Sequence, residues 1–166
     1  ISDALNHACI IDGIRLAATM KKGVHKTVFP HADYGVLREK LIAAAKGPEV
    51  TGQVWVVTDG VFSMEGDIAD LPAIRGLCDE FGAMLIVDDS HGHGVMGRTG
   101  RGTHEHFGMM GRGADGGGTS GNDIGEVDFF TGTLGKGLGG GAGGFVAGSR
   151  RGIELLIQRG RPTLFS

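Results

Sequence analysis

A run of five apolar residues that ends abruptly in polar ones constrains the fold of this chain most. Residues 83–87 read AMLIV, and residues 88–94, which follow directly, read DDSHGHG. An uninterrupted apolar run of this length is typical of a strand that is buried on both faces, as in a parallel sheet covered by helices. In open sheets of this kind, ligands bind outside the carboxyl ends of the strands. The acids and histidines after residue 87 are therefore candidates for a functional site.

A second apolar run leads into a glycine-rich stretch that carries one lysine. Residues 127–130 read VDFF, and residues 131–140 read TGTLGKGLGG, with Lys136 between two glycines. Glycine has no side chain, so another group can approach the backbone closely here. A lysine in such a place can hold a phosphate as a point charge or form a Schiff base with a carbonyl. Taken alone, the stretch also fits a surface loop with a solvated lysine.

The glycines around Lys136 match nucleotide-binding motifs poorly. A Walker loop needs a glycine five residues before the Gly-Lys pair and a serine or threonine after it, but those positions hold Phe130 and Gly137. A dinucleotide fingerprint can be placed on Gly137, Gly139 and Ala142. Because the chain has 33 glycines, such a match arises easily by chance. A non-catalytic nucleotide-binding domain is kept as the alternative from another functional class.

The remaining pattern predicts strands that alternate with helices. Residues 53–58 form an expected strand, a helix with Pro72 in its first turn is expected over 71–81, and the strand over 83–87 follows, which makes a βαβ unit. Asp33 is the expected N-cap of a helix over 34–46. Further expected elements are a helix within 1–20 with Ser2 and Asp3 as caps, short strands over 26–29 and 145–147, and a helix that Ser149 caps and that runs to residue 158.

Composition and charge exclude several classes of protein. The net charge of -3 gives no reason to expect a nucleic-acid partner, and no apolar run approaches membrane-spanning length. Two cysteines cannot form a disulfide framework and fit a reducing compartment, so we expect a cytoplasmic protein. The chain shows neither a starting methionine nor a signal peptide.

Two pairs of histidines spaced H-x-H raise a weak metal hypothesis. They are His91 with His93 and His104 with His106. Zinc sites use histidine, but these pairs come without cysteine or a helical H-E-x-x-H motif, so we expect no metal.

The acids after residue 87 and the distant lysine together suggest a particular cofactor. Side chains alternate along a strand, so Asp88 and Asp89 point to opposite sides, and one can face a ligand while the other caps the turn. Ordinary turn composition explains both acids equally well. Pyridoxal 5'-phosphate (PLP) needs a lysine for its Schiff base and a carboxylate that keeps its pyridine nitrogen protonated. Asp88, His91 and Lys136 could supply these groups.

Three segments give the chain a resemblance to a known family. Residues 87–94, 133–136 and 62–67 (FSMEGD) resemble the α-oxoamine synthases, which are acyl-CoA-dependent PLP enzymes of the aspartate aminotransferase fold. The resemblance implies an α/β fold, in which a mostly parallel sheet is flanked by helices. Within the family, residues 110–112, 131–136 and 161–166 favour the glycine C-acetyltransferases, also called 2-amino-3-ketobutyrate coenzyme A ligases.

The resemblance also implies which residues form the site. Lys136 is expected to hold PLP covalently, and Lys136, Asp88 and His91 are the expected catalytic residues. The expected contacts are Asp88 with the ring nitrogen, His91 and Ser63 with the ring oxygen, His7 with the ring face, Thr133 with the phosphate, and Ser166 with the phosphate of a neighbouring subunit. The last contact implies a homodimer.

The reaction implied by this resemblance condenses glycine with acetyl-CoA to 2-amino-3-ketobutyrate and coenzyme A, and runs in reverse in threonine breakdown. Other α-oxoamine synthases, with a different amino acid or acyl-CoA, remain alternatives, as does an inactive truncated chain. Against the family, residues 1–166 are expected to be the central part of the PLP-binding large domain, without its N-terminal segment and the C-terminal small domain. Residues 113–125, rich in glycine, are an expected insert.

Overall fold

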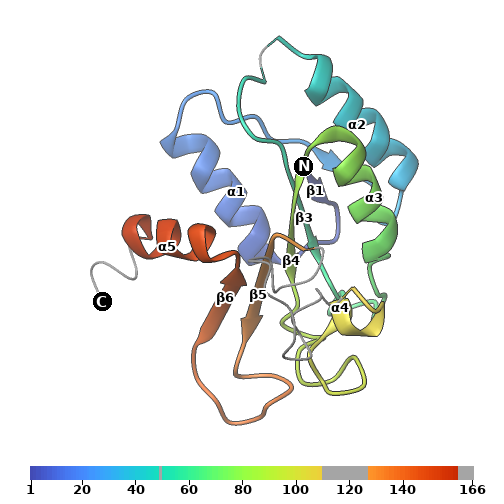
Figure 1. Cartoon of the computed structure of the whole chain (residues 1–166), viewed down its shortest axis with the longest axis vertical. Coiled ribbons are helices and arrows are strands. Elements are labelled where there is room, and N and C mark those ends of the chain that lie inside the picture. The colour runs from blue at the N-terminus through green and yellow to red at the C-terminus, as the bar shows by residue number, and fades with distance from the viewer. Residues whose placement is uncertain (49, 110–126, 161–166) are drawn as a thin grey trace.

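The computed structural model describes residues 1–48, 50–109 and 127–160 (Figure 1). Its elements in chain order are β1 (Ser2–Asp3), α1 (Ala8–Met20), β2 (Val28–Phe29), α2 (Tyr34–Lys46), β3 (Trp55–Asp59), α3 (Leu71–Phe81), β4 (Met84–Asp88), α4 (Thr103–His106), β5 (Phe129–Thr133), β6 (Gly144–Gly148) and α5 (Arg150–Arg159). The expected insert over 113–125 lies outside the described residues.

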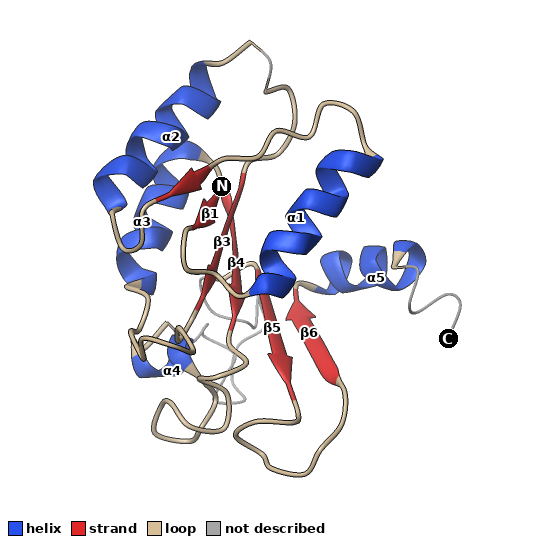
Figure 2. Cartoon of the chain, turned by 180° about the vertical axis from the view of Figure 1, so that it is seen from behind, coloured by secondary structure: helices blue, strands red, loops and turns tan. Residues whose placement is uncertain are grey.

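The strands form one sheet in the order β2-β1-β3-β4-β5-β6. All neighbouring pairs are parallel except β5 with β6, which is antiparallel. Helices α2 and α3 cover one side of the sheet, and α1 and α5 lie on the other (Figures 1 and 2). The predicted α/β class, the mostly parallel sheet and the βαβ unit β3-α3-β4 are therefore confirmed.

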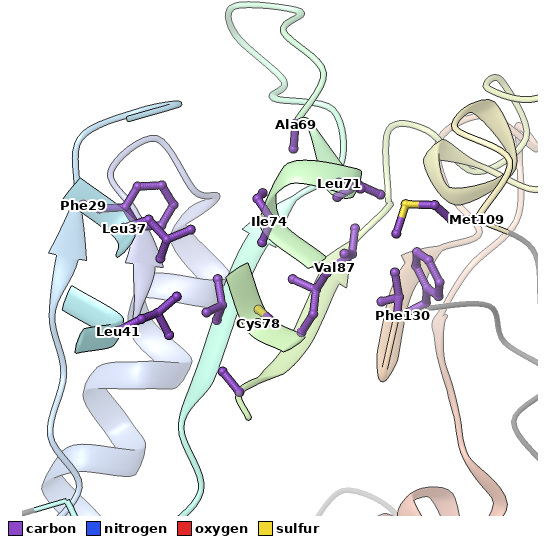
Figure 3. Packing of buried hydrophobic residues seen from close by; sticks show 14 of the residues in the cluster. Phe29, Leu37, Leu41, Ala69, Leu71, Ile74, Cys78, Val87, Met109 and Phe130 are labelled. Carbon is purple, nitrogen blue, oxygen red and sulfur yellow. The ribbon is translucent and has the colours of Figure 1, made fainter. Parts of the chain in front are cut away.

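The hydrophobic core lies between the sheet and the pair α2 and α3 (Figure 3). Leu37 and Leu41 of α2, and Ile74 and Cys78 of α3, are fully buried there against strand residues such as Val87. Helices α1 and α5 contain no buried residue. The side of the sheet that carries α2 and α3 thus provides most of the apolar burial, and α1 needs other contacts to hold it in place.

The bounds of α2 and α3 follow from local capping. The carboxylate of Asp33 accepts a hydrogen bond from the backbone N–H of Val36, and that of Asp70 accepts one from Ala73. Such side-chain acceptors satisfy backbone donors that the first turn of a helix leaves without partners. Gly82 ends α3 in the left-handed conformation, which glycine adopts at low cost. Both helices have the predicted bounds.

The start of the chain differs from the prediction. Ser2 and Asp3 do not cap a helix, because their backbones pair with β2 and Ser2 also pairs with β3, which makes them the short strand β1. The helix begins only at Ala8, and His7 is its N-cap. β5 also differs from the predicted 127–130: it begins at Phe129 and continues to Thr133, since Thr131–Thr133 pair with β6.

Within the described residues, no helix combines the length and the apolar character that crossing a membrane requires.

Candidate active site

Three parallel strands end side by side at one edge of the sheet, as Figure 2 shows for β3, β4 and β5. In the strand register Asp59 of β3 lies opposite Asp88 of β4, and Asp88 lies opposite Thr131 of β5. The pairing continues past the strand ends, because the N–H of Gly60 donates to the carbonyl of Asp88 at 2.7 Å and the N–H of Asp89 donates to that of Thr131 at 2.8 Å. Two carboxylates therefore stand next to each other where a ligand of such a sheet would bind.

Asp88 and Asp89 have different environments. Asp89 is buried, and its two carboxylate oxygens accept hydrogen bonds from the backbone N–H and the hydroxyl of Thr103 at 2.8 and 2.9 Å. Asp88 is partly exposed; its Oδ1 accepts from the N–H of Ser90 at 3.0 Å, and its Oδ2 lies 3.8 Å from the thiol of Cys9. Asp89 therefore holds the following loop, and Asp88 is the acid that a ligand can reach.

Glycines enclose the Asp89 carboxylate. A Cβ atom on Gly60 would lie 2.5 Å from its Oδ1, and a Cβ atom on Gly92 or Gly102 would lie closer still to one of its oxygens. Burial raises the pKa of Asp89 to about 6, against the lowering effect of its hydrogen bonds with Thr103. The loop after β4 is thus packed around this carboxylate.

Lys136 reaches the loop that follows β4. Its Nζ lies 2.8 Å from Nε2 of His91, although 45 residues separate the two in sequence. The pKa of His91 is lowered, chiefly by burial and next by the Lys136 ammonium, while Asp88 acts in the opposite direction. A neutral imidazole can accept the hydrogen bond of an ammonium group. Lys136 and Asp88 therefore both lie close enough to His91 to act on it electrostatically.

A close backbone contact positions the lysine loop. A Cβ atom on Gly137 would lie 2.6 Å from the carbonyl oxygen of His93, and one on Gly94 would lie 3.3 Å from the backbone of Gly137. Only residues without a side chain allow the two loops to approach in this way. Gly137 and Gly94 therefore let the loop of Lys136 lie against the turn that carries His91.

His7 joins the same edge from the other end of the chain. Its Nδ1 accepts from the N–H of Cys9 at 3.2 Å, which caps α1, and its own N–H donates to Oδ2 of Asp59 at 2.6 Å. His7 is also close enough to His91 to act electrostatically on it, in the direction that lowers the pKa of His91. The predicted site residues His7, Asp88, His91 and Lys136 are therefore neighbours.

The other predicted site residues are not joined to this group. Ser63 is exposed in the turn after β3. Thr133 accepts a hydrogen bond from the N–H of Gly135 and donates one to the carbonyl of Gly143 within its own loop. No hydrogen bond in the described part of the chain links either residue to Lys136. Ser166 lies outside the described residues.

Sequence reasoning missed Asp59 and Cys9. Asp59 ends β3, one residue beyond the predicted strand, and its place beside Asp88 follows from the strand register. The signal for it was the polar residue that follows an apolar strand, the same signal that singled out Asp88. Cys9 had no sequence signal, because its position depends on how α1 meets the sheet.

His91 lies in the candidate site, whereas two other H-x-H histidines pack against aromatic rings. His93 contacts the ring of Phe145, and His104 contacts that of Phe130, with centroid distances of 5.0 and 4.4 Å. Among the residues described, no group of three or more metal-ligating side chains comes together.

Comparison with known proteins decides the family. The family described as aminotransferase class I and II matches residues 1–166. The chain belongs to this family. An 8-amino-7-oxononanoate synthase from Alkaliphilus oremlandii is 48% identical over 166 residues, which are 100% of this chain and 36% of that protein. A 2-amino-3-ketobutyrate coenzyme A ligase from Salmonella typhimurium is 43% identical over 166 residues, with the same shares.

A solved structure agrees with this assignment. A serine palmitoyltransferase variant from S. paucimobilis, with bound PLP and myriocin, superposes with a TM-score of 0.77 at 30% identity, over 99% of this chain and 36% of that one. These homologues are PLP-dependent α-oxoamine synthases, and the fold of this chain is the aminotransferase fold of type I. The chain spans about a third of the length of the relatives it matches. Relatives of two activities match equally long stretches, so the family is shown and the particular member is not.

The side chains at the edge suit the cofactor of the family. PLP requires an amine for its aldehyde and a carboxylate for its ring nitrogen. The edge supplies one amine, Lys136, and an accessible carboxylate, Asp88, with the His91 imidazole beside the amine. The donor set and the glycine-lined lysine loop therefore fit PLP.

Proposed function

We propose that the protein to which this chain belongs is a PLP-dependent α-oxoamine synthase, which joins an amino acid to the acyl group of an acyl-CoA. The observation that carries this proposal is the 2.8 Å contact between Lys136 Nζ and His91, at the sheet edge that also presents Asp88. The names of the matching relatives support it, since they are enzymes of this kind.

Each residue has a defined task in this proposal. Lys136 holds the cofactor through its amine and, once displaced by the substrate amino group, removes a proton from the substrate α-carbon. When bound, the cofactor withdraws the electron pair that this deprotonation leaves. Asp88 keeps the proton on the ring nitrogen. His91, neutral beside Lys136, accepts a hydrogen bond from the ammonium and orients it.

The remaining predicted contacts stay proposals on the strength of the resemblance. They are Ser63 at the ring oxygen, Thr133 at the phosphate, His7 on the ring face, and Ser166 at the phosphate of a neighbouring subunit. With Ser166 comes the proposal of a homodimer. The unpaired cysteines support a cytoplasmic location.

For the substrates we propose glycine and acetyl-CoA, with the reverse reaction serving threonine breakdown. The 43% identity with 2-amino-3-ketobutyrate coenzyme A ligases supports this choice. The 48% identity with an 8-amino-7-oxononanoate synthase supports the second candidate, a different amino acid with a longer acyl-CoA. The choice is tested by measuring the release of coenzyme A by the complete protein. Glycine, alanine and serine are each combined with acetyl-CoA and with longer acyl-CoAs. Highest kcat/KM for glycine with acetyl-CoA is expected, and preference for a longer acyl chain would favour the second candidate.

The role of Asp88 predicts the effect of Asp88→Asn in the complete protein. Each pKa unit by which the carboxylate raises the ring nitrogen corresponds to about 1.4 kcal/mol in favour of the protonated form. We expect the variant to bind PLP and to lose turnover by about a hundredfold or more, two such units. Asp12→Asn, an exposed position on α1 outside the site, serves as the control and should keep its activity. An Asp88→Asn variant with most of its turnover would refute the assignment.

A further inference from the structure

The carboxylate of Asp59 has no task in the proposed function, although it lies inside the candidate site. Its side chain is buried, with 5% of the residue exposed. Its Oδ2 accepts the backbone N–H of His7 at 2.6 Å, and its own N–H donates to Oδ1 of Asn6 at 2.8 Å. Asn6 also donates from Nδ2 to the carbonyl of Val57. The end of β3 and the residues before α1 are thus joined by three hydrogen bonds.

These bonds matter because they join the start of α1 directly to the end of β3. Within the described residues α1 buries no side chain fully, and Ile10, Ile11 and Ile14 are only partly buried, so the polar contacts of its first turn add to a limited apolar contact. The N–H of His7 precedes the helix and has no intrahelical acceptor. A hydrogen bond to a carboxylate is stronger than one between neutral groups. The Asp59 carboxylate is therefore a main anchor of His7.

Asp59 also lies within the electrostatic range of the catalytic groups. Its pKa is raised to about 6, first by burial and then by the Asp88 carboxylate, while the His7 bond and Lys136 act to lower it. In the strand register it is the direct neighbour of Asp88. Anchoring His7 to Asp59 consequently places the start of α1 beside Asp88 and Lys136.

We propose that Asp59 is a positioning residue, which holds His7 and the first turn of α1 against the sheet edge that carries Asp88 and Lys136. The inference rests on the proposed function and adds a residue to its site. Asp59 need not touch the cofactor; it acts through the backbone of His7, and so fixes one wall of the PLP site.

Cys9 provides a probe for this role. Its thiol is exposed, lies 3.0 Å from Nδ1 of His7 and 3.8 Å from Oδ2 of Asp88, whereas Cys78 is buried. Alkylation of Cys9, located by peptide mapping, therefore reports on the place of the first turn of α1. Bound PLP should slow the alkylation, because the thiol is beside the acid assigned to the cofactor ring.

The experiment compares Asp59→Ala, which removes the acceptor, with Asp59→Asn, which keeps an acceptor oxygen, in the complete protein. Asp12→Ala on the exposed part of α1 is the control. For Asp59→Ala we expect PLP binding, titrated by its visible absorbance, to weaken about tenfold or more, as for loss of a hydrogen bond to a charged group. We also expect that PLP no longer slows the alkylation of Cys9 in this variant. Asp59→Asn should retain most of its PLP affinity and most of the protection of Cys9. Asp12→Ala should retain both in full.

Hydrogen exchange of the His7 amide tests the proposal without depending on a variant that folds. In the unmodified protein this amide should exchange slowly, since Asp59 is its acceptor. Rapid exchange of the His7 amide, or unchanged PLP affinity and Cys9 protection in folded Asp59→Ala, would overturn the proposal. Failure of the unmodified protein to bind PLP would instead contradict the proposed function, and the exchange of His7 would still decide the role of Asp59.

Discussion

At the scale of single residues, the two adjacent aspartates at the end of β4, Asp88 and Asp89, have different roles. Asp89 is buried and engaged by Thr103, whereas Asp88 is accessible at the sheet edge. Alternation along the strand predicts that they face opposite ways, and the sequence alone does not show which is buried. Which of the two is buried depends on the tertiary contact between Asp89 and Thr103, which the loop after β4 brings back to the sheet.

The burial of Asp89 predicts a pH dependence of stability. Its pKa is raised from 3.8 to about 6 in the folded state, so the folded protein binds this proton more tightly than the unfolded chain does. Its contribution to the free energy of unfolding is therefore largest below the unfolded pKa and falls as the pH rises toward 6. In Asp89→Asn, the side-chain oxygen can still accept the hydrogen bond from the N–H of Thr103, and the side-chain amide can donate one to the Thr103 hydroxyl.

We expect the stability of Asp89→Asn, relative to the unmodified protein, to rise between pH 4.5 and 7.5, because the variant lacks the buried charge. Urea unfolding of both proteins at the two pH values measures this difference. A relative stability that is the same at both values, or that falls with pH, would show that Asp89 does not titrate as its burial indicates.

At the scale of elements, the sequence was most informative where local contacts set the boundaries. Asp33, Asp70 and Gly82 cap α2 and α3 through bonds within a few residues, and both helices have the predicted bounds. The two-residue strand β1 could not be predicted, because its pairing with β2 and β3 brings together distant residues. Asp59 does carry a local signal, as a polar residue at the end of an apolar strand, but its place beside Asp88 is set by strand register.

The loop between β4 and α4 allows a direct test of its packing. Gly102 has φ +114°, and a Cβ atom there would overlap with the carboxylate of Asp89. Gly108 also has a positive φ of +68°, but a Cβ atom there would meet nothing within 4 Å. Gly108→Ala should thus cost only backbone strain, of about 1–2 kcal/mol. Gly102→Ala should cost about 1–3 kcal/mol more, because the methyl group would overpack against Asp89 and because φ +114° with ψ -166° is a conformation that other residues rarely adopt.

Urea unfolding of the two glycine variants measures both costs, with Gly108→Ala as the control for a positive-φ glycine that has no close neighbour. Equal losses of stability in Gly102→Ala and Gly108→Ala would mean that the Asp89 carboxylate is not enclosed in this way.

At the scale of the whole molecule, the candidate site exists only when the sheet has formed. His7, Asp59, Asp88, His91 and Lys136 come from the start of α1, the ends of β3 and β4, and the loop after β5. The sequence pattern found the lysine and the acid, because each follows an apolar strand, and the resemblance added His7. Their approach to one another needed the sheet order, which no local pattern contains.

Because the site is formed only in the folded state, PLP should stabilise the complete protein. A ligand that binds only the folded state adds about 2.7 kcal/mol to the free energy of unfolding at a free concentration of one hundred times its Kd. We expect Tm to rise with PLP concentration, and the rise to shrink strongly in Lys136→Ala. A Tm that does not respond to PLP in the unmodified protein would contradict the proposed function, and a Tm that rises with a nucleotide instead would favour the non-catalytic nucleotide-binding domain.

The central claim is that Lys136 bonds to the cofactor at the sheet edge where Asp88 ends its strand. Reduction of the PLP-loaded complete protein with borohydride, followed by peptide mapping, tests this most directly. We expect a phosphopyridoxyl group on Lys136, and none on the corresponding peptide of Lys136→Ala. Attachment of the group to another lysine in the unmodified protein would show that Lys136 does not bond to the cofactor.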